Sequence, residues 1–174
     1  DKAIESYQKA INIKPDFAEA YYNLGVALQN TGKLELAIQN YEKTVDIEPG
    51  FYSAYENLGS AYLVLGQADK AIAIMSDQLC KVAVSADLYY NLGTAHKVKK
   101  DFLPAIDCFR SAIELNRKHS LAFNNLGNSL FELGRVQDAI NAYKEAININ
   151  GRYADAFNNL GNAVKELGDV DHAL

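Results

Sequence analysis

Hydrophobic and polar positions repeat along this chain at a fixed interval of 34 residues. The tripeptide Asn-Leu-Gly occurs five times at this interval, at 23–25, 57–59, 91–93, 125–127 and 159–161. An aromatic residue lies two positions before each copy, and an alanine lies twelve positions after each glycine. Because no insertion or deletion disturbs the interval, the pattern predicts an array of similar structural units.

Each unit is expected to contain two helices. The first helices are predicted at about 18–31, 52–65, 86–99, 120–133 and 154–167, and the second helices at about 1–14, 35–48, 69–82, 103–116 and 137–150. Four first helices are followed by glycine, at 32, 66, 134 and 168, and glycine readily adopts the left-handed conformation that closes a last helical turn. The third is followed by Lys100, where that conformation costs about 1 kcal/mol. We therefore expect this internal turn to be the loosest or the most altered.

The second helix expected at 69–82 is the weakest match to the others. Met75 and Gln78 stand where the equivalent helices carry an aromatic and usually a small residue. No proline or glycine ends this helix, whereas Pro15 and Pro49 end two of the others.

The glycine of each Asn-Leu-Gly tripeptide is expected to serve packing rather than ligand binding. Glycine inside a helix costs about 1 kcal/mol relative to alanine, so its recurrence needs a compensating close contact. We expect the alanine of each second helix to face this gap, with aromatic and leucine side chains sealing its sides. These alanines are at 37, 71, 105, 139 and 173.

Together these residues resemble the tetratricopeptide repeat. The shared pattern is aromatic-x-x-Leu-Gly, alanine twelve residues later, an aromatic four further on and often a final proline; AYYNLGVALQNTGKLELAIQNYEKTVDIEP at 20–49 is a near-complete copy. The resemblance implies an all-α, right-handed superhelix of antiparallel helix pairs, with the first helices on its concave side. It implies one array with partial repeats at 1–17 and 154–174 and full repeats at 18–51, 52–85, 86–119 and 120–153. It also implies a protein- or peptide-binding scaffold.

The asparagines of the tripeptide form the candidate binding site. On a helix they lie opposite the leucine and glycine, so they are expected to line the exposed concave wall. The candidate peptide-binding residues are Asn23, Asn57, Asn91, Asn125 and Asn159, with Asn128 and Asn162 one turn later and Tyr22 and Tyr90 one position earlier. A side-chain amide can pair with the N–H and the C=O of one peptide unit. At first-helix spacings of about 8–10 Å, this stripe would hold roughly every third peptide bond of an extended chain.

Other roles for this stripe remain open. The asparagines could instead support contacts between helices, or keep the wall soluble. The same wall carries six acids and two lysines: Glu19, Glu56, Asp87, Glu132, Asp155, Glu166, Lys97 and Lys165. This balance favours a neutral to basic partner, although such charges are often only solvated.

The chain can be compared with two subfamilies of the repeat. Those that clamp the C-terminal carboxylate of chaperones present lysine and arginine where this chain has Tyr22, Glu56, Tyr90 and Asn124. The long, insertion-free array resembles the substrate-selecting arm of O-linked N-acetylglucosamine transferases. That arm, and an architectural or self-assembling spacer, are the alternatives to a general scaffold.

Composition narrows the possibilities further. The chain is 49% hydrophobic, has 3 prolines and carries a net charge of −5, which favours a folded protein that binds neither nucleic acid nor membrane. Cys80 and Cys108 have no paired spacing, which indicates reduced thiols and a cytoplasmic location, with the nucleus not excluded.

No catalytic motif is found, so we expect neither enzymatic activity, nor a cofactor, nor a metal. His96 is expected on a core-facing side of its helix, and His119 and His172 have no partners at metal-ligand spacing.

The two ends of the sequence fall in the middle of the pattern. The chain starts inside a second helix and ends on "DVDHAL", the opening of another. We expect Phe157, Leu160 and Val164 to be partly exposed, so that residues beyond 174 or the N-terminal helix of another molecule, in end-to-end self-association, would cover them.

Overall fold

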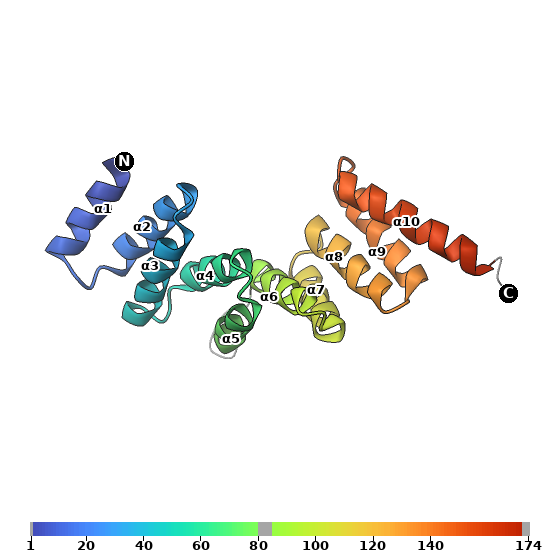
Figure 1. Ribbon diagram of the computed structural model, residues 1–174, viewed down its shortest axis with the longest axis horizontal. Helices are drawn as coiled ribbons and strands as arrows, with labels where there is room; N and C mark the ends of the chain where they lie inside the picture. The colour runs from blue at the N-terminus through green and yellow to red at the C-terminus, as the bar shows by residue number, and fades with distance from the viewer. Residues whose placement is uncertain (1, 80–84, 172–174) are drawn as a thin grey trace. The chain divides into compact units, whose positions relative to one another are not determined.

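The structure, a computed structural model, describes residues 2–79 and 85–171 (Figure 1). The described residues form α1 (Lys2–Ile13), α2 (Ala18–Asn30), α3 (Leu34–Ile47), α4 (Tyr52–Val64), α5 (Ala68–Leu79), α6 (Ala86–Val98), α7 (Phe102–Leu115), α8 (Ser120–Glu132), α9 (Val136–Ile149) and α10 (Ala154–Asp171). These described ranges contain no strand. The prediction of an all-α chain of paired helices is confirmed.

The chain divides into two compact units, which are described separately. The N-terminal unit, residues 1–83, contains α1 to α5, and the C-terminal unit, residues 84–174, contains α6 to α10. Within each unit, every helix packs against the next one along the chain. The even-numbered helices are the first helices of the repeats, and the odd-numbered ones are the second helices.

One helix boundary differs from its prediction. Helix α10 runs through Gly168 to Asp171, whereas the pattern predicted an end near residue 167. In the other repeats the chain reverses at the glycine and a second helix packs back onto the first, which offsets the lost helical hydrogen bonds. No described second helix packs onto α10 in this way, so the helical hydrogen bonding continues through Gly168.

The turn at Lys100 has the same geometry as the glycine turns, so the prediction of an altered turn is wrong. Lys100 has φ 63°, against 76°, 70° and 72° at Gly32, Gly66 and Gly134. The Lys100 N–H donates to the Lys97 carbonyl at 2.9 Å, as the Gly32 N–H donates to Gln29 at 3.0 Å. Packing of α6 on α7 therefore imposes the conformation, at a cost of about 1 kcal/mol for a side chain with a Cβ.

Four of the five repeated glycines, Gly25, Gly59, Gly93 and Gly127, contact a large side chain of the second helix rather than the alanine. A Cβ on Gly25 would lie 2.6 Å from Tyr41, and one on Gly127 would lie 2.5 Å from Tyr143. Each aromatic ring thus lies directly on the glycine, and the expectation that alanine faces this gap is corrected. The conserved spacing places the alanines elsewhere in the core, where Ala37, Ala71, Ala105 and Ala139 are fully buried.

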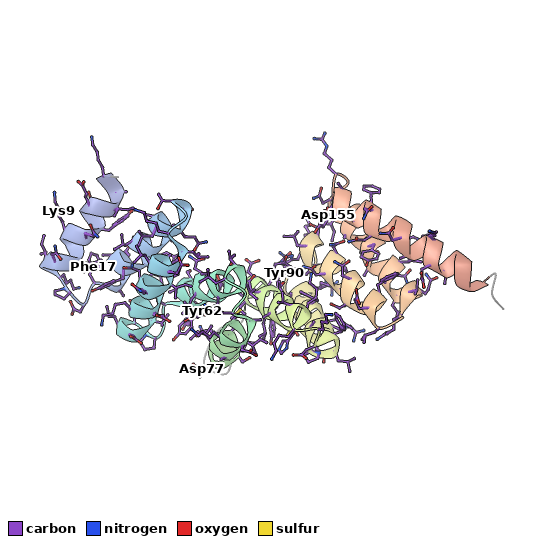
Figure 2. The ribbon with its side chains drawn as sticks, viewed as in Figure 1. Lys9, Phe17, Tyr62, Asp77, Tyr90 and Asp155 are labelled. Carbon is purple, nitrogen blue, oxygen red and sulfur yellow. The ribbon has the colours of Figure 1, made fainter. Side chains whose placement is uncertain are left out.

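Helix α5 achieves the same packing with different residues. Met75 is fully buried, and its sulfur would lie 2.7 Å from a Cβ on Gly59, so an unbranched thioether replaces the ring. Gln78 is 2% exposed, and neither polar atom of its amide has a hydrogen-bond partner among the described residues. Tyr62 of α4, labelled in Figure 2, is also buried in this unit. Cys80 and the predicted end of this helix at 82 lie outside the described residues.

Candidate functional site

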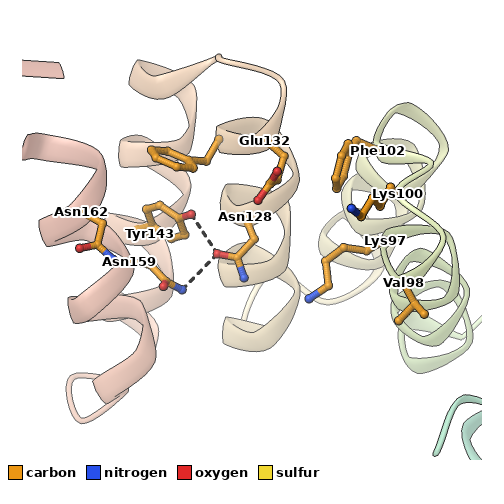
Figure 3. Close-up of a pocket in the computed structure, with 10 residues that line it drawn as sticks. Lys97, Val98, Lys100, Phe102, Asn128, Glu132, Tyr143, Asn159 and Asn162 are labelled. Carbon is orange, nitrogen blue, oxygen red and sulfur yellow. Dashed lines mark hydrogen bonds between the residues drawn. The ribbon is translucent and has the colours of Figure 1, made fainter. Parts of the chain in front are cut away.

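Helices α6, α8 and α10 of the C-terminal unit line a hollow of about 480 Å³ (Figure 3). Its lining consists of Lys97, Val98, Lys100, Phe102, Asn128, Phe131, Glu132, Tyr143, Asn159 and Asn162. Most of these residues belong to first helices, which carry the predicted asparagine stripe. The structure therefore brings three predicted site residues, Asn128, Asn159 and Asn162, into one hollow.

Hydrogen bonds connect the amides in this hollow across three helices. The side-chain oxygen of Asn128, Oδ1, accepts a hydrogen bond from the Tyr143 hydroxyl at 2.9 Å. It accepts a second from the side-chain nitrogen of Asn159, Nδ2, at 3.1 Å (Figure 3). The same nitrogen, Nδ2 of Asn159, also donates to the side-chain oxygen of Asn124, Oδ1, at 3.1 Å. These contacts fix the orientation of Asn128 and Asn159, while Asn162 is exposed.

Asn125 is buried, although the sequence predicted that it forms part of an exposed wall. It is 8% exposed, and its side-chain oxygen, Oδ1, accepts a hydrogen bond from the Lys97 ammonium at 2.7 Å. Its amide nitrogen donates to the Tyr90 hydroxyl at 3.2 Å. Helical periodicity did not indicate this burial, because Lys97 and Tyr90, which cover Asn125, belong to the adjacent first helix, α6.

The same pairing occurs in the N-terminal unit. The Asn57 amide nitrogen donates to the Tyr22 hydroxyl at 3.2 Å, 35 residues away in sequence. Both side chains are half-buried, as is Asn23, and on α6 Asn91 is half-buried as well. The tripeptide asparagine of one repeat thus bonds to the residue that precedes the tripeptide in the repeat before. These bonds provide the helix-to-helix role that the sequence left open.

The charged residues that line this hollow are mainly basic, unlike those of the wall as a whole. Lys97 and Lys100 line it together with one acid, Glu132. Burial lowers the pKa of Lys97. It raises the pKa of Tyr143 to about 12, with Glu132 adding to the effect, so this hydroxyl remains a donor at neutral pH. The mildly acidic character predicted for the whole wall does not hold inside this hollow.

Several lining residues were missed at the sequence level because they lie outside the stripe. Lys100 comes from the turn after α6, Phe102 from the start of α7 and Tyr143 from α9. Tyr143 is the aromatic that packs on Gly127, and its hydroxyl bonds to Asn128 of the hollow. The position of Tyr143 in the repeat indicates a core residue, and nothing in the pattern indicates that its hydroxyl also reaches the wall.

His119 has a structural role that the sequence did not reveal. It precedes α8, and its Nδ1 accepts from the Ala122 N–H at 3.2 Å, which caps the helix. Its Nε2 lies 3.4 Å from an Asp87 carboxylate oxygen, and its ring packs on Tyr90 at 4.8 Å between centroids. His96, with an 18% exposed side chain, lies 3.7 Å from Asp101. His172 lies outside the described residues.

No group of three or more histidine, cysteine, aspartate or glutamate side chains in 2–79 and 85–171 could hold a metal ion. In those same ranges, no helix combines the length and apolar character needed to cross a bilayer.

Comparison with family models identifies repeats along most of the chain. A model described as TPR repeat matches residues 1–32 and 127–168. Two models described as tetratricopeptide repeat match 18–51 with 86–119, and 40–73 with 108–141. A comparison with curated proteins found no match.

Solved structures share the fold along nearly the whole chain. The MamA protein is 28% identical with a TM-score of 0.80, over 90% of this chain and 85% of MamA. YrrB, described as a TPR protein with an unusual peptide-binding site, is 26% identical with a TM-score of 0.80, over 98% of this chain and 88% of YrrB. The APC/C hetero-tetramer Cut9–Hcn1 shares the fold at 22% identity and a TM-score of 0.81, over 98% of this chain and 34% of the matched one.

The repeat models and the solved relatives support a protein-interaction scaffold built as a solenoid of helix pairs. The chain belongs to the tetratricopeptide repeat family.

Proposed function

We propose that the hollow of the C-terminal unit binds an extended segment of a partner protein along α6, α8 and α10. The main support for this proposal is that Asn128, Asn159 and Asn162, from successive first helices, line one hollow. That YrrB is described as having a peptide-binding site supports a similar use of this chain.

The groups in the hollow suit a peptide backbone. Asn162 is exposed, and its amide offers two donors and one acceptor. The side-chain nitrogen of Asn128, Nδ2, lies 3.5 Å from Oδ1 of Asn125, which is long for a hydrogen bond. A peptide carbonyl could replace Oδ1 as the acceptor at low cost. The half-buried Phe131 gives apolar surface for a ligand side chain. Backbone pairing would provide affinity, and this ring would provide selectivity.

The proposal can be tested by selecting peptides from a phage-displayed random library with the full chain. A selected peptide is then titrated into the chain and its variants by calorimetry. Asn162→Ala and Asn128→Ala should each weaken binding about 5- to 10-fold, as expected for the loss of one hydrogen bond. Asn148→Ala, an exposed change on α9 outside the hollow, is the matched control and should leave the affinity unchanged.

Two results would count against the proposal. One is a selected peptide whose affinity is the same for Asn162→Ala, Asn128→Ala and the unchanged chain. The other is competition that maps every selected peptide to the N-terminal unit. In either case the amide pairs would have only their role between helices.

A further inference from the structure

Each unit has a second kind of hollow, between two second helices and over the first helix that connects them. In the N-terminal unit it lies among α3, α4 and α5 and measures about 580 Å³. In the C-terminal unit it lies among α7, α8 and α9 and measures about 400 Å³. Neither hollow contains a residue of the tripeptide asparagine stripe.

These two hollows occupy equivalent places in the repeat. Leu58 and Leu126 lie 68 residues apart, which is two repeat lengths, and they line the two hollows at the same register. Tyr62 corresponds to Leu130 in the same way. In the N-terminal hollow, Val45 and Ile74 complete an apolar floor.

The charged residues around the two floors sum to opposite signs, negative in the N-terminal hollow and positive in the C-terminal one. Glu42, Asp46 and Asp77 line the N-terminal hollow with Lys70, whereas Arg110, Arg135 and Lys144 line the C-terminal one with Asp138 and Glu145. Glu42 and Arg110 occupy the same register, whereas Asp46 and Asp77 correspond to the acids Glu114 and Glu145. Because the same helix packing carries either sign at the register of Glu42, packing does not require an acid at that position.

In the N-terminal hollow, Tyr62 holds one side chain of the acidic edge, which consists of Glu42, Asp46 and Asp77. Its ring is 7% exposed, and its hydroxyl donates to the Glu42 carboxylate. The Lys70 ammonium lies over the same ring, 5.4 Å from its centroid. Glu42 and Asp46 are exposed on successive turns of α3, with half-buried Val45 between them. The edge therefore presents ordered negative charge directly beside apolar surface.

We propose that the hollow among α3, α4 and α5 is a second docking site, and that its occupant is a partner-protein segment with arginine or lysine beside an apolar side chain. The cation would approach Glu42, Asp46 and Asp77, and the apolar side chain would pack on the half-buried Val45 and Ile74. Complementary charge steers such a segment and discriminates against acidic ones. This site is separate from the hollow of the proposed function.

Nuclear magnetic resonance titration of the nitrogen-15-labelled full chain tests this inference. The ligands are two synthetic tripeptide amides, acetyl-Leu-Arg-Leu and acetyl-Leu-Glu-Leu. The arginine peptide should shift the backbone resonances of Asp46 and Ala73 in a saturable way, while those of Asn128 and Asn159 stay in place. The glutamate peptide should shift none of these resonances.

Three charge reversals sharpen the test. Glu42→Arg installs the residue found at this register in the C-terminal unit and should weaken binding of the arginine peptide about tenfold, through lost attraction and added repulsion. Asp46→Arg should act similarly without removing the partner of Tyr62. Glu48→Arg changes the net charge equally at the end of the same helix but does not line the hollow, so it should change the affinity less than twofold. Circular dichroism checks that each variant is folded.

Equal responses to the two peptides would overturn the inference, as would an unchanged affinity in a folded Asp46→Arg variant. Equal weakening by Glu48→Arg and Asp46→Arg would also overturn it, because it would indicate attraction to net charge alone. The test is independent of the amide hollow, since Asn162→Ala should leave the binding of the arginine peptide unchanged.

Discussion

The Asn125 side-chain amide lies 3.2 Å from the hydroxyl of Tyr90, which belongs to the preceding first helix. Asn57 and Tyr22 are paired across the same sequence distance, as are Asn159 and Asn124. In each pair, one side chain comes from the tripeptide and the other from the position that precedes it one repeat earlier. The stripe therefore connects consecutive first helices within a unit, whether or not a ligand is bound.

Asn125→Ala should destabilise the C-terminal unit by about 1–3 kcal/mol, because it leaves the half-buried Lys97 and Tyr90 groups without their partner. Urea unfolding followed by circular dichroism measures this change. Asn162→Ala removes an exposed amide of the same type and should change the unfolding free energy by less than about 0.5 kcal/mol. Equal effects of the two changes would contradict a supporting role for Asn125.

Gly127→Ala should be destabilising by about 1–3 kcal/mol, since the new methyl group would lie 2.5 Å from the Tyr143 ring. Gly161 occupies the same position in the next repeat, but a Cβ there meets nothing within 4 Å. Gly161→Ala should therefore stabilise α10 by up to about 1 kcal/mol through helix propensity. Thermal unfolding of both variants compares them directly, and changes of the same sign would refute the packing argument.

Lys100→Gly should stabilise the chain by up to about 1 kcal/mol, because glycine adopts a φ of 63° without strain. The reciprocal change, Gly134→Lys, places a side chain at φ 72° and should cost a similar amount. Chemical denaturation of the two variants provides the measurement. A loss of stability in Lys100→Gly would show that the lysine side chain itself stabilises this turn.

Stability should fall steeply in alkaline solution. Burial raises the pKa of Tyr41, Tyr62 and Tyr143 to about 12, so the folded state keeps protons that the unfolded state releases near pH 10. The stabilisation is complete below about pH 10 and is lost as the pH rises towards about 12. Urea midpoints measured across this range should fall less steeply for Tyr143→Phe than for the unchanged chain. Parallel slopes would mean that Tyr143 does not contribute.

The regular spacing of aromatic, leucine, glycine and alanine residues was sufficient to predict the helices, because each repeat depends mainly on local propensity and on contacts with its neighbours. The ends of most described helices were placed within one or two residues, from glycine or proline where these occur and from the 34-residue interval elsewhere. The exception is Gly168, where a glycine signal did not end α10. Whether such a signal ends a helix depends on the helix that packs after it.

Helical periodicity indicates which face of a helix a residue occupies, but not what covers that face. It placed Asn125 on the stripe and could not show that Lys97 and Tyr90 of another helix bury it. It predicted a close contact at each repeated glycine, while tertiary packing decided that Tyr41 or Tyr143, and not alanine, lies at Gly25 and Gly127. The sequence by itself thus determined the helices and their order, whereas the hollows, the burial of the asparagines and the strained turn at Lys100 were decided by tertiary packing, because they depend on how side chains from different repeats share one space.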